Sequence, residues 1–104
     1  PFGIVGLETS VGLTITELVK TGILPPMQMV EKMSFNPAKI LHSKAGTLKE
    51  GRAADIAIID PDAEWTVNPE KFRSKGKNTP FAGRKLKGKV LYTICDGRIV
   101  YEAE

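Results

Sequence analysis

The fold is decided by K-N-T-P-F-A-G-R-K-L-K-G at Lys77–Gly88, which runs into V-L-Y-T-I-C-D-G-R-I-V-Y at Val90–Tyr101. Asp96-Gly97 divides the second stretch, and this dipeptide accepts the positive φ angles that a two-residue hairpin turn requires. The pattern therefore predicts a β-hairpin with strands at Lys89–Asp96 and Arg98–Glu102. Strands this short and this few cannot close a barrel, so we expect them to need pairing partners from elsewhere.

Two more strands are predicted before the hairpin. A-D-I-A-I-I-D at Ala54–Asp60 is almost continuously apolar, which indicates a strand buried on both faces. Asp60-Pro61-Asp62 is typical of a turn and is expected to end this strand. E-W-T-V at Glu64–Val67 predicts a short strand with alternating faces. Asn68–Gly83 then forms a long basic loop, and loops beyond about 12–15 residues are usually functional or packed against another element.

The first part of the chain predicts helices. Apolar residues recur at spacings of three and four from Glu8 onward, and Gly22 ends the pattern. A second short helix should follow Pro25-Pro26, because proline is tolerated in the first turn. A third is expected over Pro37–Leu41, with Asn36 as its N-cap. These helices have more apolar surface than they can cover mutually, so we expect them to lie on something else.

Composition narrows the class of protein. The chain of 104 residues, with 41% hydrophobic and 26% charged residues, suits at most one soluble globular domain. No apolar run approaches the roughly 20 residues of a membrane span, and the start lacks the basic region of a signal peptide. The single cysteine, Cys95, agrees with a reducing compartment. We expect a cytoplasmic chain with no membrane partner.

Positive charge is concentrated in one stretch. The net charge is +3, and eight of the 15 Lys and Arg residues lie from Lys71 to Lys89 without an acidic residue among them. Binding of nucleic acid would require stacking aromatics or a known motif beside such a patch, and only Phe72 and Phe81 are candidates. We expect no nucleic-acid partner and a loop that packs on the molecule, with Phe81 in an apolar socket. A clamp for an acidic substrate is the alternative.

The residues that could carry chemistry are isolated from one another. His42 is the only histidine, has lysines near it, and is expected to be a surface residue, because zinc needs three or four converging ligands. Cys95 should be a buried small hydrophobe, since no neighbouring base would activate it. Asp55, Asp60 and Asp62 match no calcium loop, and Asp55 is expected to accept hydrogen bonds from buried backbone amides at a strand start. We therefore assign no catalytic residue and no metal ligand.

Four segments carry a resemblance to a known family: P-F-G-I-V-G-L-E-T at Pro1–Thr9, S-F-N-P-A-K-I at Ser34–Ile40, G-T-L-K-E-G-R-A-A-D-I-A-I-I-D-P at Gly46–Pro61, and K-N-T-P-F-A-G at Lys77–Gly83. With them the chain resembles the C-terminal part of bacterial dihydroorotases, in the amidohydrolase superfamily. The last three motifs have counterparts in allantoinases and dihydropyrimidinases. The opening motif favours dihydroorotase.

The resemblance implies an α+β fragment. Residues 1–45 would be outer helices after the last strand of a (β/α)8 amidohydrolase barrel, also called a TIM barrel. Residues 46–104 would be the C-terminal strands of a small β-sandwich domain, with the basic loop at 68–88. The main partner would be the rest of the enzyme chain. Separated from it, apolar faces and open strand edges would be exposed, so the isolated fragment is expected to self-associate.

The resemblance also implies a reaction: zinc-dependent, reversible hydrolysis of L-dihydroorotate to N-carbamoyl-L-aspartate in pyrimidine biosynthesis. In this family the metal activates a water molecule and an aspartate transfers the proton, and these groups would lie upstream of this chain. What remains here is Phe2-Gly3, whose backbone amides would bind the small-molecule substrate, so the isolated chain is expected to be inactive. The alternatives are an allantoinase- or dihydropyrimidinase-type enzyme and a non-catalytic, amidohydrolase-like structural subunit.

Overall fold

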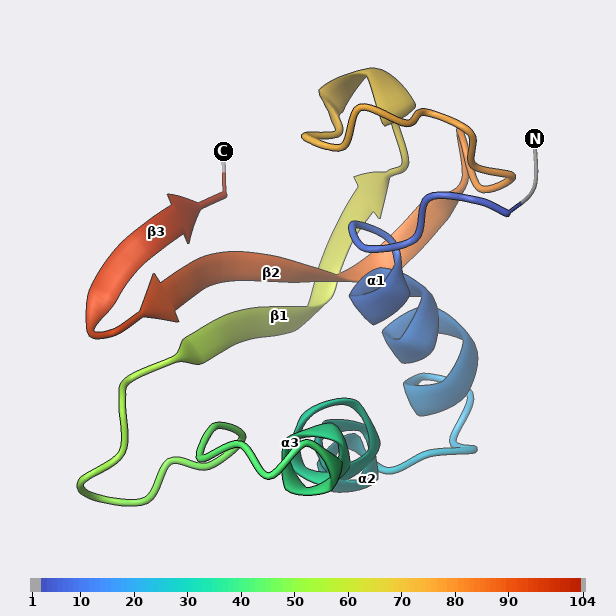
Figure 1. Cartoon of the computed structure of the whole chain (residues 1–104). Coiled ribbons are helices and arrows are strands. Elements are labelled where there is room, and N and C mark those ends of the chain that lie inside the picture. Colours follow the sequence, from blue (N-terminus) through green and yellow to red (C-terminus); the bar gives the residue numbers. More distant parts are fainter. Residues whose placement is uncertain (1–2, 104) are drawn as a thin grey trace.

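A computed structural model describes residues 3–103. Within this range two helical segments accompany a three-stranded antiparallel sheet (Figure 1). The expected α+β composition is confirmed for the described part. None of the helices in residues 3–103 has the length and apolar character to span a bilayer.

The first helical segment agrees with the predicted one. It consists of α1, Ser10–Thr14, continued by the wider π-helical turn η1, Ile15–Val19. It begins two residues later than the apolar pattern suggested. Gly22 follows it with a φ of 82°, a conformation that glycine adopts without steric cost. The predicted stop at Gly22 is thus confirmed.

The second and third predicted helices are one continuous helical segment, so the predicted break at Asn36 is wrong. The segment contains α2, Pro26–Val30, the π-helical turn η2, Glu31–Phe35, and α3, Asn36–Ile40. Asn36 has helical angles, φ −65° and ψ −45°, and its N–H donates to Glu31 five residues back. A π turn widens the helix just where Pro37 would otherwise clash with the preceding turn. Asn36 therefore does not cap a new helix.

The sheet has the order β1-β2-β3, with β1 at Ile56–Thr66, β2 at Lys85–Cys95 and β3 at Arg98–Glu102. The predicted hairpin is confirmed, and Asp96 and Gly97 at its turn have φ angles of 50° and 78°. A short 3-10 turn, η3 at Pro69–Lys71, opens the long loop. Because β2 already begins at Lys85, the last four residues expected in the basic loop belong to the strand.

The two strands predicted at Ala54–Asp60 and Glu64–Val67 are one bent strand, so the prediction that Asp60-Pro61 ends a strand is wrong. Asp60 pairs with Lys89 and Glu64 pairs with Lys87, which leaves three residues of β1 opposite Gly88 alone. Asp62 N–H donates to Asp60 Oδ1 at 2.9 Å, so the turn chemistry is present within the strand. Proline is compatible with a strand at such a bulge, where its missing N–H breaks no ladder hydrogen bond.

The core lies where the first helix meets the bend of the sheet. Ile15 packs on Gly88, and Trp65 Nε1 donates to the Gly88 carbonyl at 2.8 Å. Thr16 Oγ1 donates to the Lys87 carbonyl at 3.0 Å and accepts from the Lys87 N–H at 2.9 Å. One helix side chain therefore satisfies both backbone groups of a strand residue. The buried apolar residues of the described chain are Ile15, Met29, Val67 and Leu86.

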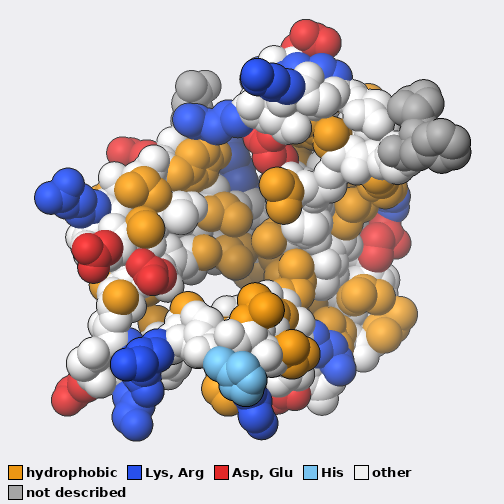
Figure 2. Space-filling view, in the orientation of Figure 1, with side chains coloured by type: hydrophobic (Ala, Val, Ile, Leu, Met, Phe, Trp, Pro, Cys, Tyr) orange, Lys and Arg blue, Asp and Glu red, His pale blue; other side chains and the backbone are white. Residues whose placement is uncertain are grey.

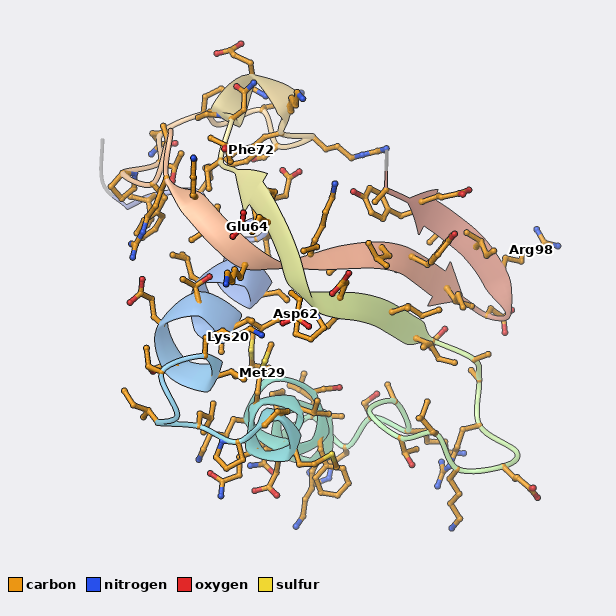
Figure 3. All side chains as sticks on the ribbon, turned by 180° about the vertical axis from the view of Figure 1, so that it is seen from behind. Lys20, Met29, Asp62, Glu64, Phe72 and Arg98 are labelled. Atoms are coloured by element: carbon orange, nitrogen blue, oxygen red, sulfur yellow. The ribbon has the colours of Figure 1, made fainter. Side chains whose placement is uncertain are left out.

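Two ion pairs bracket this contact. Lys20 Nζ contacts Asp62 Oδ1, joining the helix to the bulge of β1, and Arg84 Nη2 contacts Glu17 Oε1 at the start of β2. Figure 3 shows Lys20 and Asp62 reaching toward each other between helix and strand. The hydrogen bond and positive charge of Lys20 lower the pKa of the Asp62 carboxyl below its ordinary value of 3.8.

Much apolar surface is open. Figure 2 shows hydrophobic side chains gathered over a hollowed face beside the sheet and the second helical segment. The predicted burial of Ala54–Asp60 on both faces is wrong for the described chain: Ala57 is exposed and Ile58 is 44% exposed, because no second layer covers β1 there. The exposed large hydrophobic residues from the second helical segment onward include Met27, Val30, Met33, Phe35, Ile40, Leu48, Ile58, Ile99 and Val100.

The contact between Ile15 and Gly88 is testable by Gly88→Ala. A Cβ at residue 88 would lie 2.7 Å from Ile15 Cδ1 and 2.9 Å from Ile15 Cβ, and the φ of 104° disfavours any side chain. We expect a loss of about 2–4 kcal/mol in the free energy of unfolding, measured by urea denaturation. Gly51→Ala is the control, because its φ is also positive, 83°, but its Cβ would meet nothing; about 1 kcal/mol is expected there. Equal losses in the two variants would contradict the packing argument.

The Lys20–Asp62 pair predicts an acid-dependent term in stability. The folded-state pKa of Asp62 is depressed, so the pair stabilises the fold above the unfolded value of 3.8 and is lost as the pH falls through the lower folded pKa. In Asp62→Asn, the melting temperature should therefore fall less steeply between about pH 5 and pH 2 than in the unsubstituted chain. The effect is small because Asp62 is exposed. Identical pH profiles would refute it.

Candidate functional site

The candidate substrate-contacting loop lies at the start of the described chain. Of the two predicted residues, Phe2 lies outside the described residues, and Gly3 is exposed with a φ of 85°. The segment from Gly3 to Leu7 has no regular secondary structure before a turn leads into α1. Substrate contact by Phe2 and Gly3 stays a prediction.

The N-terminal segment is attached to the basic loop by hydrogen bonds over a long sequence separation. Asn78 Nδ2 donates to the Gly3 carbonyl at 3.0 Å. The Val5 N–H donates to the Asn78 carbonyl at 3.1 Å. Asn78 thus binds two successive peptide groups of the N-terminal backbone through different atoms.

Glu8 makes the second attachment. Its carboxylate accepts hydrogen bonds from the backbone N–H of Arg73, at 3.1 Å to Oε2, and of Ser74, at 3.3 Å. The next residue, Thr9, is buried and its hydroxyl donates to the Gly6 carbonyl at 3.3 Å. The carboxylate is therefore used to fix two backbone segments against each other.

A shallow pocket of about 260 Å³ separates these attachments. It is lined by residues 4–8 of the N-terminal segment and by Phe72 and Ser74 of the basic loop. Among the residues described by the structure, Glu8 is the one ionisable residue of its lining, and that carboxylate already accepts from two amides. Such a pocket can hold a small apolar group, but it offers no acid–base pair.

The residues weighed as catalytic or metal-binding candidates lie apart and have structural contacts. His42 is exposed, as expected, and adopts a φ of 55° after the second helical segment. Asp55 Oδ1 accepts from the Asp96 N–H of the hairpin turn at 2.8 Å, so the expected contact with a backbone amide is present, but this amide is exposed and belongs to the turn, not buried at a strand start. Asp60 and Asp62 stabilise the bulge and the contact with Lys20. Nowhere in residues 3–103 do three His, Cys, Asp or Glu side chains gather as a metal site would need.

The prediction that Cys95 is buried is wrong. Cys95 is exposed at the end of β2, beside the hairpin turn. The alternating pattern correctly predicted a strand here. In the described residues, however, no second layer covers the sheet at that end. Burial of a strand residue depends on the element facing it, and this element is absent from the described residues.

The basic residues of the loop make contacts within the chain. Arg73 lies over the Tyr101 ring at 5.8 Å, and Arg84 lies over the Phe81 ring at 5.9 Å. Lys77 Nζ donates to the Phe72 carbonyl at 2.8 Å. These contacts agree with a loop packed on the molecule. Phe81 is half-buried and its socket is partly formed by a guanidinium group.

Glu8 and Asn78 were missed as functional candidates in the sequence. Both lie inside motifs that carried the family resemblance, but their contacts span 65 and 75 residues. Local patterns of hydrophobicity or turn residues give no information about partners so far apart. Only the membership of Glu8 and Asn78 in two family motifs hinted that these segments belong together.

Comparisons with known proteins agree with this arrangement. The amidohydrolase family model matches residues 3–100. Dihydroorotase from Pelotomaculum thermopropionicum is 57% identical over 102 residues, covering 98% of this chain and 24% of the relative. Dihydroorotase from Clostridioides difficile is 55% identical over 99% of this chain and 24% of its own length. The chain thus spans about a quarter of the length of these curated relatives.

Solved structures agree with the fold. L-hydantoinase (dihydropyrimidinase) from Arthrobacter aurescens superposes with a TM-score of 0.89 at 37% identity, over 96% of this chain and 23% of that one. Dihydropyrimidinase from Brevibacillus agri NCHU1002 gives a TM-score of 0.82 at 26% identity, over 88% of this chain and 20% of the other. With the family model matching nearly the whole sequence, the chain belongs to the amidohydrolase family.

Proposed function

We propose that this chain is the C-terminal part of a dihydroorotase, which interconverts L-dihydroorotate and N-carbamoyl-L-aspartate in the cytoplasm as a step of pyrimidine biosynthesis. The observation that carries the proposal is the 57% identity to a dihydroorotase over 98% of the chain. The opening motif, which favours dihydroorotase over related cyclic amidohydrolases, lies largely within the matched residues.

In this proposal the two parts of the chain belong to different domains of the enzyme. Residues 1–45 cover a (β/α)8 barrel after its last strand, and residues 46–104 complete a small β-sandwich. The helix contact at Gly88 joins the two parts. The exposed apolar residues of the second helical segment and of β1 supply the surfaces that the rest of the enzyme would cover.

The described residues do not offer a binding site for the zinc ions of the proposed enzyme. Residues 3–103 contain no group of three candidate ligands, and a zinc site needs at least three protein ligands. We therefore propose that the metal and the catalytic aspartate belong to other parts of the enzyme. The contribution of this chain to the active site is the loop at Phe2 and Gly3, whose glycine lets backbone approach a ligand closely.

A hydantoinase- or dihydropyrimidinase-type activity is the second candidate. The superposition on L-hydantoinase at a TM-score of 0.89 favours it. These enzymes share the fold, so the superposition does not distinguish substrates, whereas the sequence identity is higher to the dihydroorotases. We therefore rank dihydroorotase first.

Grafting tests the two activities against each other. We expect residues 3–103, placed in the dihydroorotase of Pelotomaculum thermopropionicum instead of its matched segment, to give L-dihydroorotate hydrolysis within about tenfold of the parent kcat/KM, because helix faces and loop match their surroundings. The same graft in the L-hydantoinase of Arthrobacter aurescens should lose more hydantoin hydrolysis than that. The isolated chain with added zinc should turn over neither substrate. A folded dihydroorotase graft without activity, beside an active hydantoinase graft, would reverse the ranking.

Self-association is expected of the isolated chain. The sheet ends in two open edges, β1 and β3, and large apolar side chains such as Ile99 and Val100 are exposed on the outer strand. Light scattering of the chain at increasing concentration should show a mass that rises above the 11.3 kDa of one copy. Replacing Val100 by Lys should lower this association, since charge on an edge strand opposes pairing. A single-copy mass at every concentration would contradict the expectation.

A further inference from the structure

We infer that Asn78 and Glu8 are positioning residues that fix the shape of the loop from Gly3 to Leu7. This inference rests on the proposed function, because it gives that loop a substrate to meet. Asn78 belongs to the basic loop and binds the N-terminal segment, whereas Glu8 belongs to the N-terminal segment and binds the basic loop. Neither side chain needs to touch the substrate.

Asn78 determines which way the loop amides face. Its side chain binds the Gly3 carbonyl, and the peptide that carries this carbonyl also carries the Ile4 N–H. In a trans peptide the C=O and N–H point in opposite directions, so the bond turns the Ile4 N–H away from Asn78. The Asn78 carbonyl accepts the Val5 N–H and fixes the following peptide in the same way. Two successive peptide planes are thereby held.

Glu8 fixes the other end of the loop. Its carboxylate accepts two consecutive backbone amides, those of Arg73 and Ser74. Hydrogen bonds to an ionised acceptor are the stronger kind. Because Glu8 directly precedes the buried Thr9 at the start of α1, this attachment also sets where the loop enters the helix.

The basic loop that carries Asn78 is itself held by several contacts. A Cβ at Gly76 would lie 2.7 Å from Val5 Cγ1, so the two segments touch with no room to spare. Lys77 Nζ binds the Phe72 carbonyl, and Arg73 stacks over Tyr101 of β3. At the base, Gly83 N–H donates to the Val67 carbonyl at 2.8 Å. The support therefore continues into the sheet.

The expected consequence is a change in substrate binding more than in the chemical step. A loop already held in its binding shape loses little conformational freedom when substrate arrives. When the attachment is lost, that ordering must occur on binding, which raises KM while kcat changes little if the loop binds ground and transition states equally.

The experiment uses the active graft in the Pelotomaculum thermopropionicum dihydroorotase. Asn78→Asp keeps the size of the side chain and removes the N–H donor to Gly3, and we expect KM for L-dihydroorotate to rise about fivefold with kcat within twofold. Glu8→Ala should raise KM about tenfold, and Glu8→Gln, which keeps an acceptor, should restore it to within about threefold. Hydrogen–deuterium exchange of the peptide from Gly3 to Leu7 should quicken in Asn78→Asp and Glu8→Ala.

Two control variants change exposed residues for which none of these contacts is seen. Lys75→Ala changes an exposed residue of the same loop, and Glu50→Ala removes an exposed glutamate elsewhere. Both should leave KM and the exchange of the N-terminal peptide unchanged.

The outcomes separate this inference from the proposed function. An unsubstituted graft that folds but does not hydrolyse L-dihydroorotate refutes the proposed function and with it the substrate role of the loop. An active graft whose KM and exchange are unaffected by both substitutions overturns the positioning role alone. A matching rise of exchange in α1 and the sheet, with kcat falling and KM constant, assigns the residues to general stability and also overturns it. If Asn78→Asp fails to fold, the Glu8→Ala and Glu8→Gln pair decides by the same readouts.

Discussion

The structure depends on the close approach of one helix to one glycine. Ile15 sits on Gly88, a position without a side chain, at the point where β1 bulges and β2 continues. Thr16 completes the contact by binding both backbone groups of Lys87. β3 pairs only with the far half of β2, so the helix occupies the part of the strand edge that β3 leaves open. The ion pairs of Lys20 with Asp62 and of Glu17 with Arg84 flank this contact.

The same contact places the N-terminal loop. α1 starts directly after Thr9, so docking the helix on β2 brings the preceding residues to the basic loop between β1 and β2. Glu8 and Asn78 then make the final attachments. The positive charge of this region is accounted for in part by contacts inside the chain, such as Arg84 with Glu17 and Arg73 with Tyr101. These internal contacts agree with the interpretation of a loop packed on the molecule.

Features with a local physical cause could be predicted from the sequence. The Asp96-Gly97 turn, the helix that stops at Gly22 and the role of Asp55 toward an amide all follow from the residues concerned. Errors arose where two local rules competed or where burial mattered. A π turn lets the helix continue through Pro37, and a bulge lets the strand continue through Pro61, so neither proline ends its element. Burial of Cys95 and Ala54–Asp60 required a covering layer that the described residues do not supply. The site partners Glu8 and Asn78 had no local pattern at all.

The long sequence separation between the N-terminal segment and the residues that hold it also affects when these contacts can form during synthesis. The partner of the Gly3 carbonyl is Asn78, and Ile15 of the first helical segment packs on Gly88; both partners are synthesised later than the residues they contact. During translation, Gly3 is synthesised 75 residues before Asn78, so this contact cannot form until the basic loop has emerged from the ribosome. Contacts between residues so far apart in the sequence form more slowly than local ones. The loop proposed to meet the substrate can therefore take its final shape only after the basic loop has been synthesised.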